Sequence, residues 1–105
     1  MKKIALMTLL LAAWTLAIAS KEFVVAQKDK KFSTGHLKVK VGDTVSFKND
    51  DPFFHNIFSL SKTQSFDLGS YPQGQARRTT FSKEGTVEIE CAIHPEMKMV
   101  IEVEK

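Results

Sequence analysis

Residues 37–48 read LKVKVGDTVSFK and carry the clearest fold signal in the chain. Apolar residues at positions 37, 39 and 41 alternate with lysines, and those at 45 and 47 alternate with polar residues. A period of two places apolar side chains on one face of a strand, so both runs predict half-buried β-strands. Gly42-Asp43 between them predicts a two-residue hairpin turn.

Outward from this stretch, short alternating segments recur along the chain. Five further strands are expected, over residues 22–27, 54–59, 75–81, 87–91 and 99–103. Turn-forming residues separate them, at Gly35, 50–52, Gly69, 72–74 and 83–85. No segment has helical periodicity over three turns. The pattern predicts an all-β fold, an antiparallel sandwich or barrel, and 105 residues allow one domain.

The N-terminus predicts an export signal. Lys2 and Lys3 precede an uncharged run that closes on Ala17-Ile18-Ala19, a small-x-small cleavage site. The run is shorter than the roughly 20 apolar residues of a membrane span. We therefore expect residues 1–19 to be a cleaved secretory signal peptide, with an uncleaved anchor as the alternative. Residues 20–105 would form the mature domain, with no membrane span.

The charge balance limits the class of partner. The chain has 15 Lys and Arg against 12 Asp and Glu, and loss of Lys2 and Lys3 leaves 13 against 12. A nearly neutral mature domain argues against nucleic-acid binding.

Cys91 is the only cysteine, although exported proteins normally carry paired cysteines. A lone thiol there is buried and inert, intermolecularly paired, catalytic or metal-bound. His94 and Met97 follow Cys91 at intervals of three, and His55 stands just after a predicted turn. Two imidazoles, a thiolate and a thioether form the set expected of a mononuclear copper electron-transfer site. Zinc is permitted by the same ligands, but a methionine ligand is atypical for structural zinc.

Segment 91–97, CAIHPEM, resembles the copper loop of cupredoxins, the blue (type 1) copper proteins. Its Cys-x-x-His-x-x-Met spacing is similar to that of the amicyanin-like and plastocyanin-like branch grouped with methylamine utilisation. Residues 41–45 and 49–56 look like the cupredoxin lead-in to the first histidine ligand. The resemblance implies a cupredoxin-like Greek-key β-sandwich with one type 1 copper ion. The ligands it implies are His55, Cys91 and His94 in the equatorial plane and Met97 as the axial ligand.

The resemblance also implies two details of the site. The backbone N–H of Asn56 would point at the Cys91 sulfur, while the Asn56 side chain would tie the two ligand loops together. Met99 fits a second axial spacing, five residues after His94. Met97 is preferred because a ligand at Met99 would leave the last strand starting too late to pair fully.

The function implied is that of a soluble periplasmic one-electron carrier rather than an enzyme. It would be a monomer that passes electrons between redox proteins, such as a dehydrogenase or a cytochrome. One cysteine cannot bridge a binuclear copper centre, and three histidines cannot build a trinuclear cluster. A copper chaperone or storage protein is the alternative, and a metal-free interaction module is a third. His36 and Arg77-Arg78 are expected to be solvated residues outside the site.

Overall fold

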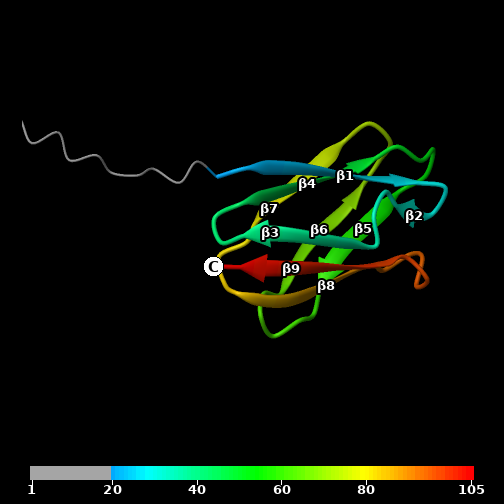
Figure 1. Cartoon of the computed structure of the whole chain (residues 1–105). Coiled ribbons are helices and arrows are strands. Elements are labelled where there is room, and N and C mark those ends of the chain that lie inside the picture. Colours follow the sequence, from blue (N-terminus) through cyan, green and yellow to red (C-terminus); the bar gives the residue numbers. More distant parts are fainter. Residues whose placement is uncertain (1–19) are drawn as a thin grey trace, which may run out of the picture.

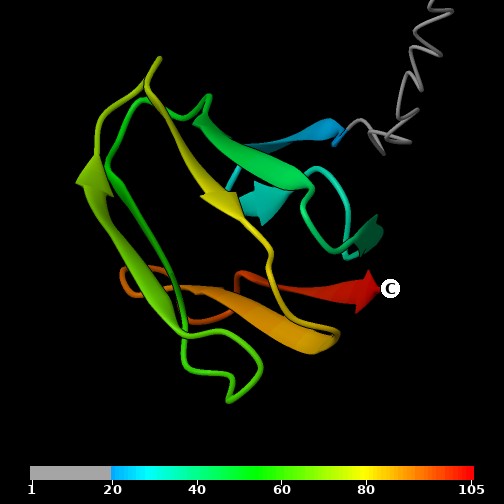
Figure 2. The same cartoon turned by 90° about the vertical axis from the view of Figure 1, so that its left-hand side faces the viewer.

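The computed structural model describes residues 20–105, which form two β-sheets packed face to face (Figures 1 and 2). The predicted signal peptide, residues 1–19, lies outside the described part. Within residues 20–105 no helix is long and apolar enough to cross a bilayer. The strands are β1 (Glu22–Lys28), β2 (Lys31–Phe32), β3 (His36–Lys40), β4 (Thr44–Asn49), β5 (His55–Ser59), β6 (Phe66–Tyr71), β7 (Ala76–Thr80), β8 (Gly85–Cys91) and β9 (Lys98–Glu104).

The order of the strands confirms the all-β sandwich and adds parallel pairs to it. One sheet runs β2-β1-β4-β7 and the other β3-β9-β8-β5-β6. Most neighbours are antiparallel, but β1 pairs with β4 and β3 with β9 in parallel. The expectation of antiparallel pairing throughout was therefore too simple. Parallel neighbours arise because the chain crosses repeatedly from one sheet to the other, as in a Greek-key arrangement.

The predicted hairpin at Gly42-Asp43 was wrong. Strands β3 and β4 belong to opposite sheets, so the turn carries the chain across the sandwich. Gly42 takes a positive φ of 96°, and the Asp43 carboxylate accepts the N–H groups of Lys40 and Lys21. Alternation cannot distinguish the two arrangements, because each strand buries one face whether its partner lies beside it or opposite it.

Strand β6 was missed, because Gly69 within it suggested a turn. Gly69 has a φ of 72°, and a Cβ there would lie 2.8 Å from a guanidinium nitrogen of Arg77. That guanidinium donates a hydrogen bond to the Leu68 carbonyl. The glycine thus permits a close approach of a neighbouring side chain inside a strand.

The core lies between the sheets and is built from the inward-facing residues of each strand. The buried apolar set includes Val25, Val45, Phe47, Ile57, Val87, Ile89 and Ile101. Strand β5 pairs with β8, and Ile57 is opposite Cys91. This register brings the start of β5 and the end of β8 to one end of the sandwich, where the β4–β5 and β8–β9 loops meet. The C-terminus lies at the opposite end (Figure 1).

Candidate metal centre

The centre forms where two strands of one sheet begin and end. His55 is the first residue of β5 and Cys91 is the last of β8, and both side chains are buried. Ile57 is opposite Cys91, the last residue of β8. His55 comes two residues before Ile57, so it lies beyond the end of β8, next to the loop that carries His94. The β5–β6 register shifts between Asn56 and Phe58, and such irregularities are common beside functional sites.

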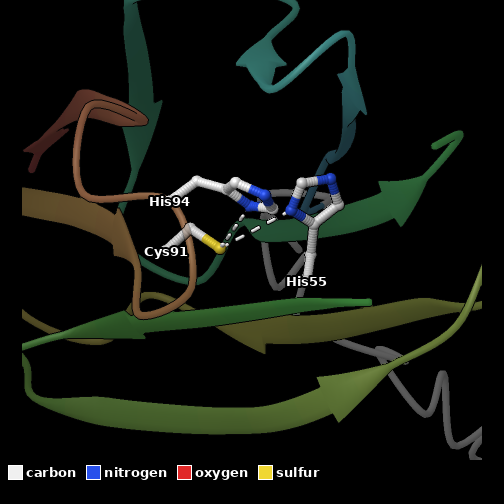
Figure 3. Close-up of side chains that lie close together, drawn as sticks. All are labelled: His55, Cys91 and His94. Carbon is white, nitrogen blue, oxygen red and sulfur yellow. Dashed lines mark hydrogen bonds between the residues drawn. The ribbon is translucent and has the colours of Figure 1, made fainter. Parts of the chain in front are cut away.

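The two histidines and the cysteine converge on one point (Figure 3). The Cys91 Sγ lies 3.5 Å from the Nδ1 of His55 and 3.8 Å from the Nδ1 of His94. Each of the three residues offers one ligand atom, and these three atoms all lie within 4.8 Å of one another. His55 is fully buried, whereas His94 is partly exposed. The sequence therefore predicted correctly that these three residues come together.

These separations fit a single metal ion. A metal–sulfur bond of about 2.3 Å and a metal–nitrogen bond of about 2.0 Å, at an angle of 110–120°, place the two donor atoms about 3.5–3.7 Å apart. The observed sulfur–nitrogen distances are 3.5 and 3.8 Å. A thiolate and two imidazoles are also ligands that copper accepts in both of its common oxidation states.

Backbone hydrogen bonds hold the sulfur and its loop in place. The N–H of Asn56 donates to the Cys91 Sγ at 3.5 Å, as expected, and the N–H of Ala92 donates to the Asn56 carbonyl at 2.9 Å. The Asn56 side chain was expected to tie the two ligand loops together. Its Oδ1 is instead buried without a hydrogen-bond partner, so this oxygen does not make that connection. The connection is made by the backbone of Asn56.

Asp51 is a site residue that the sequence reasoning missed. Its Oδ2 lies 2.8 Å from the Nε2 of His55, and both side chains are almost completely buried. A carboxylate only accepts hydrogen bonds, so Nε2 is the donor in this contact, and in the neutral ring this tautomer leaves the lone pair on Nδ1, the atom on the sulfur side. A carboxylate four residues before a candidate histidine ligand was the signal that could have identified it.

The pKa of Asp51 is lowered, although burial opposes this shift. Burial of the carboxylate raises its pKa, but the hydrogen bond from His55 and those from the N–H groups of Lys30 and Asp29 together outweigh burial. Asp51 therefore stays ionised to lower pH than an ordinary aspartate and remains a pure acceptor for the His55 ring.

Phe53 packs against both histidines and closes one side of the centre. Its ring centroid lies 5.4 Å from that of His55 and 5.2 Å from that of His94, and the two imidazoles are 5.1 Å apart. Phe54, by contrast, is 55% exposed, and Ile93 beside His94 is 49% exposed. Phe53 thus packs beside both imidazoles, while Phe54 and Ile93 are exposed apolar residues adjacent in sequence to Phe53 and His94.

Met97 and Met99 are both buried, at 1% and 2% exposure. Met97 lies in the β8–β9 loop, where its N–H donates to the His94 carbonyl at 2.9 Å. Met99 lies within β9, opposite Ile89. The position of Met97 in the ligand loop is consistent with the axial role, which stays a prediction.

The other residues singled out from sequence lie outside the centre. The His36 side chain is 53% exposed and has its Nε2 3.7 Å from a Glu102 carboxylate oxygen. Arg78 is exposed and forms an ion pair with Glu22, as expected of a solvated strand. Arg77 is only partly exposed, because its guanidinium packs over the Tyr71 ring.

Comparison with solved structures agrees with this architecture. A reduced, Cu(I) methionine-to-alanine variant of amicyanin superimposes with a TM-score of 0.74 at 30% identity, covering 79% of this chain and 82% of that one. A copper-containing nitrite reductase from Thermus scotoductus gives the same TM-score at 28% identity. The match spans 80% of this chain but only 22% of the reductase, so it concerns one part of a larger protein.

Sequence relatives give the same result. The chain is 32% identical over 94 residues to the methylamine utilization protein MauL of Methylorubrum extorquens, covering 89% of this chain and 82% of MauL. It is 32% identical over 90 residues to the amicyanin of Paracoccus denitrificans, covering 83% and 69%. A model of copper-binding proteins of the plastocyanin/azurin family matches residues 19–104. The chain therefore belongs to the plastocyanin/azurin family of copper-binding proteins, the cupredoxins.

Proposed function

We propose that residues 20–105 form a blue copper protein that carries single electrons. Copper would be held by His55, Cys91 and His94, with Met97 as the axial ligand. The observation that carries this proposal is the convergence of one sulfur and two Nδ1 atoms at separations suited to one metal ion. The second methionine, Met99, is assigned to the core.

Copper, when bound, would supply a one-electron couple between Cu(II) and Cu(I). The protein's contribution is to hold the donor atoms still. Strand β8 fixes Cys91, the Asn56 N–H donates to its sulfur, and Asp51 holds the His55 ring. Donor atoms held by a sandwich in this way move little when the charge of the metal changes, which favours fast electron transfer.

A copper chaperone or storage protein is the competing proposal. Delivery of copper to a partner requires ligands that can be exchanged at an accessible surface. Here Cys91 and His55 are 2% and 0% exposed, and only His94 reaches the surface. Burial of two of the three donors favours retention of copper and electron transfer through the His94 edge.

The sequence and the relatives support a periplasmic setting for this carrier. Residues 1–19 would direct export and be removed, leaving a monomeric periplasmic carrier. One relative is named for methylamine utilization, which supports redox proteins, such as a dehydrogenase or a cytochrome, as partners. The exposed apolar residue Ile93, next to His94 in the chain, suits the brief contacts of redox proteins.

The rate of electron self-exchange between oxidised and reduced copies tests the carrier proposal without a partner. Ile93→Lys places a charge beside His94 and should slow self-exchange at least tenfold, because two like charges would meet at the contact. Leu60→Lys is the matched control, since Leu60 is 77% exposed just beyond the other end of β5. Equal rates in both variants, or no measurable exchange in the copper-loaded wild type, would contradict the proposal.

A further inference from the structure

The Asp51 carboxylate makes contacts on two sides. One side faces His55, whose Nε2 lies 2.8 Å from Oδ2. On the other side the N–H of Asp29 donates to Oδ1 at 2.7 Å and the N–H of Lys30 donates to Oδ2 at 3.1 Å. Asp51 is itself fixed, because its own N–H donates to the Asn49 Oδ1 at 2.8 Å. A single buried carboxylate thus joins a candidate metal ligand to a distant turn.

The turn between β1 and β2 needs such support. Asp29 and Lys30 have φ values of 54° and 58°, and neither residue is a glycine. The left-handed conformation is unfavourable for residues with a Cβ, so neighbouring structure has to hold it. The two amides that Asp51 accepts belong to these two residues. Removal of the carboxylate would leave the turn without these two hydrogen bonds.

A second contact connects the same turn to the centre. The Lys30 ammonium lies 5.8 Å from the centroid of the Phe53 ring, and that ring packs against both His55 and His94. The turn therefore touches the centre through a charged hydrogen-bond network and through an aromatic ring.

We propose that Asp51 is a positioning residue that sets the tautomer of His55 and couples copper binding to the order of the Asp29–Lys30 turn. This inference rests on the proposed role of His55 as a copper ligand. With a metal held at Nδ1, the His55 ring would lose electron density and its Nε2 would donate a stronger hydrogen bond to the Asp51 carboxylate. A carboxylate held more firmly in turn holds both amides more firmly. Linkage is reciprocal, so an ordered turn also raises copper affinity.

The first test is the Asp51→Asn variant. An amide has one oxygen instead of two, so it cannot accept all three bonds and places its NH₂ group against a donor. Copper affinity, measured by competition with a chelator, should fall about 10- to 100-fold. Asp50→Asn is the matched control, because Asp50 is the adjacent residue but pairs at the surface with Lys48. The control should change affinity less than about twofold.

The second test is amide hydrogen exchange at Asp29 and Lys30, followed by NMR. In the wild type, loading with diamagnetic Cu(I) should slow exchange at these two amides several-fold. In the copper-free protein, Asp51→Asn should speed their exchange at least tenfold, while Asp50→Asn should not. The wild-type comparison needs no variant and therefore holds even if Asp51→Asn folds poorly.

The outcomes separate this inference from the proposed function. A normal thiolate-to-copper band in the wild type, together with unchanged affinity and unchanged amide exchange in Asp51→Asn, would overturn the role of Asp51 alone. A copper-saturated wild type without that band would overturn the proposed function and the copper coupling with it. Amide exchange in the copper-free variants would still report whether Asp51 supports the turn.

Discussion

Two methionines lie close together in sequence, and their different settings predict different roles. Met97 belongs to the loop that also carries His94, whereas Met99 is an inward residue of β9 opposite Ile89. An axial thioether tunes the potential of a copper site, and a core methionine fills space. The two residues should therefore respond differently to the same substitution.

Met97→Leu should shift the reduction potential and the visible spectrum of the copper-loaded protein. Met99→Leu should leave both nearly unchanged and alter the free energy of unfolding by less than about 1.5 kcal/mol, because the volume is conserved. Cyclic voltammetry and denaturant unfolding of both variants make the comparison. A spectral change seen only in Met99→Leu would identify Met99, and not Met97, as the axial ligand.

The sequence indicated which residues meet at the centre but not what holds them. The spacing of Cys91 and His94, with His55 after a turn, was enough to predict a cluster that the structure brings together. The contact of Asp51 with His55 had a local signal, but its contacts with Asp29 and Lys30 could not be predicted, because these residues lie more than 20 positions away. For Asn56 the backbone hydrogen bond to the sulfur was predicted correctly and the side-chain connection was not, since a resemblance does not fix the orientation of a side chain.

The individual strands were more predictable than their pairing. Alternation identified most strands, because a sandwich strand buries one face and exposes the other. It could not assign β3 and β4 to opposite sheets, since the same pattern serves both arrangements. Strand β6 was not predicted, because Gly69 within it suggested a turn. The glycine makes room for Arg77 of β7, and a contact between different strands cannot be read from the sequence.

Tyr71, the only tyrosine in the chain, joins strands across the sandwich. Tyr71 lies on β6. Its hydroxyl accepts a hydrogen bond from the Gln27 Nε2 at 2.9 Å and donates a hydrogen bond to the Phe47 carbonyl at 3.0 Å. Gln27 and Phe47 belong to β1 and β4 of the opposite sheet. Tyr71→Phe should cost about 1–3 kcal/mol of unfolding free energy, because it leaves buried polar groups without partners.

The same residue gives a test at alkaline pH. Burial raises the pKa of Tyr71 to about 12, whereas an unfolded tyrosine ionises near pH 10. The contribution of neutral Tyr71 to the free energy of unfolding is therefore fully present below about pH 10. It is lost between about pH 10 and pH 12, by at most about 1.4 kcal/mol per pH unit. Since lysines also titrate there, the wild type and Tyr71→Phe should be compared. The difference between their unfolding free energies should shrink over this range, and a constant difference would contradict the burial argument.

The molecule as a whole is small, and metal binding should contribute to its stability. A sandwich formed by residues 20–105 has a modest core. The centre lies where the β4–β5 and β8–β9 loops meet, so a metal would fasten together segments that are remote in sequence. Ligands that bind only the folded state stabilise it by mass action.

Copper loading should therefore raise the melting temperature. At a free copper concentration 100 times Kd the gain is about 2.7 kcal/mol, which corresponds to roughly 10–20 °C for a domain of this size. Differential scanning calorimetry without copper and at that free copper concentration measures the shift, and an excess of chelator should reverse it. An unchanged melting temperature with copper demonstrably bound would mean that the unfolded chain binds copper as tightly as the folded one, and would contradict a site that folding assembles.

The decisive measurement for the copper assignment is a titration with Cu(II), followed by visible absorption, of the wild type and of Cys91→Ser. Circular dichroism would establish that both proteins are folded. The wild type should develop an intense thiolate-to-copper charge-transfer band that saturates at one copper per chain, and Cys91→Ser should show none. A band that survives in Cys91→Ser, or a copper-saturated wild type without one, would contradict a blue copper centre built on Cys91.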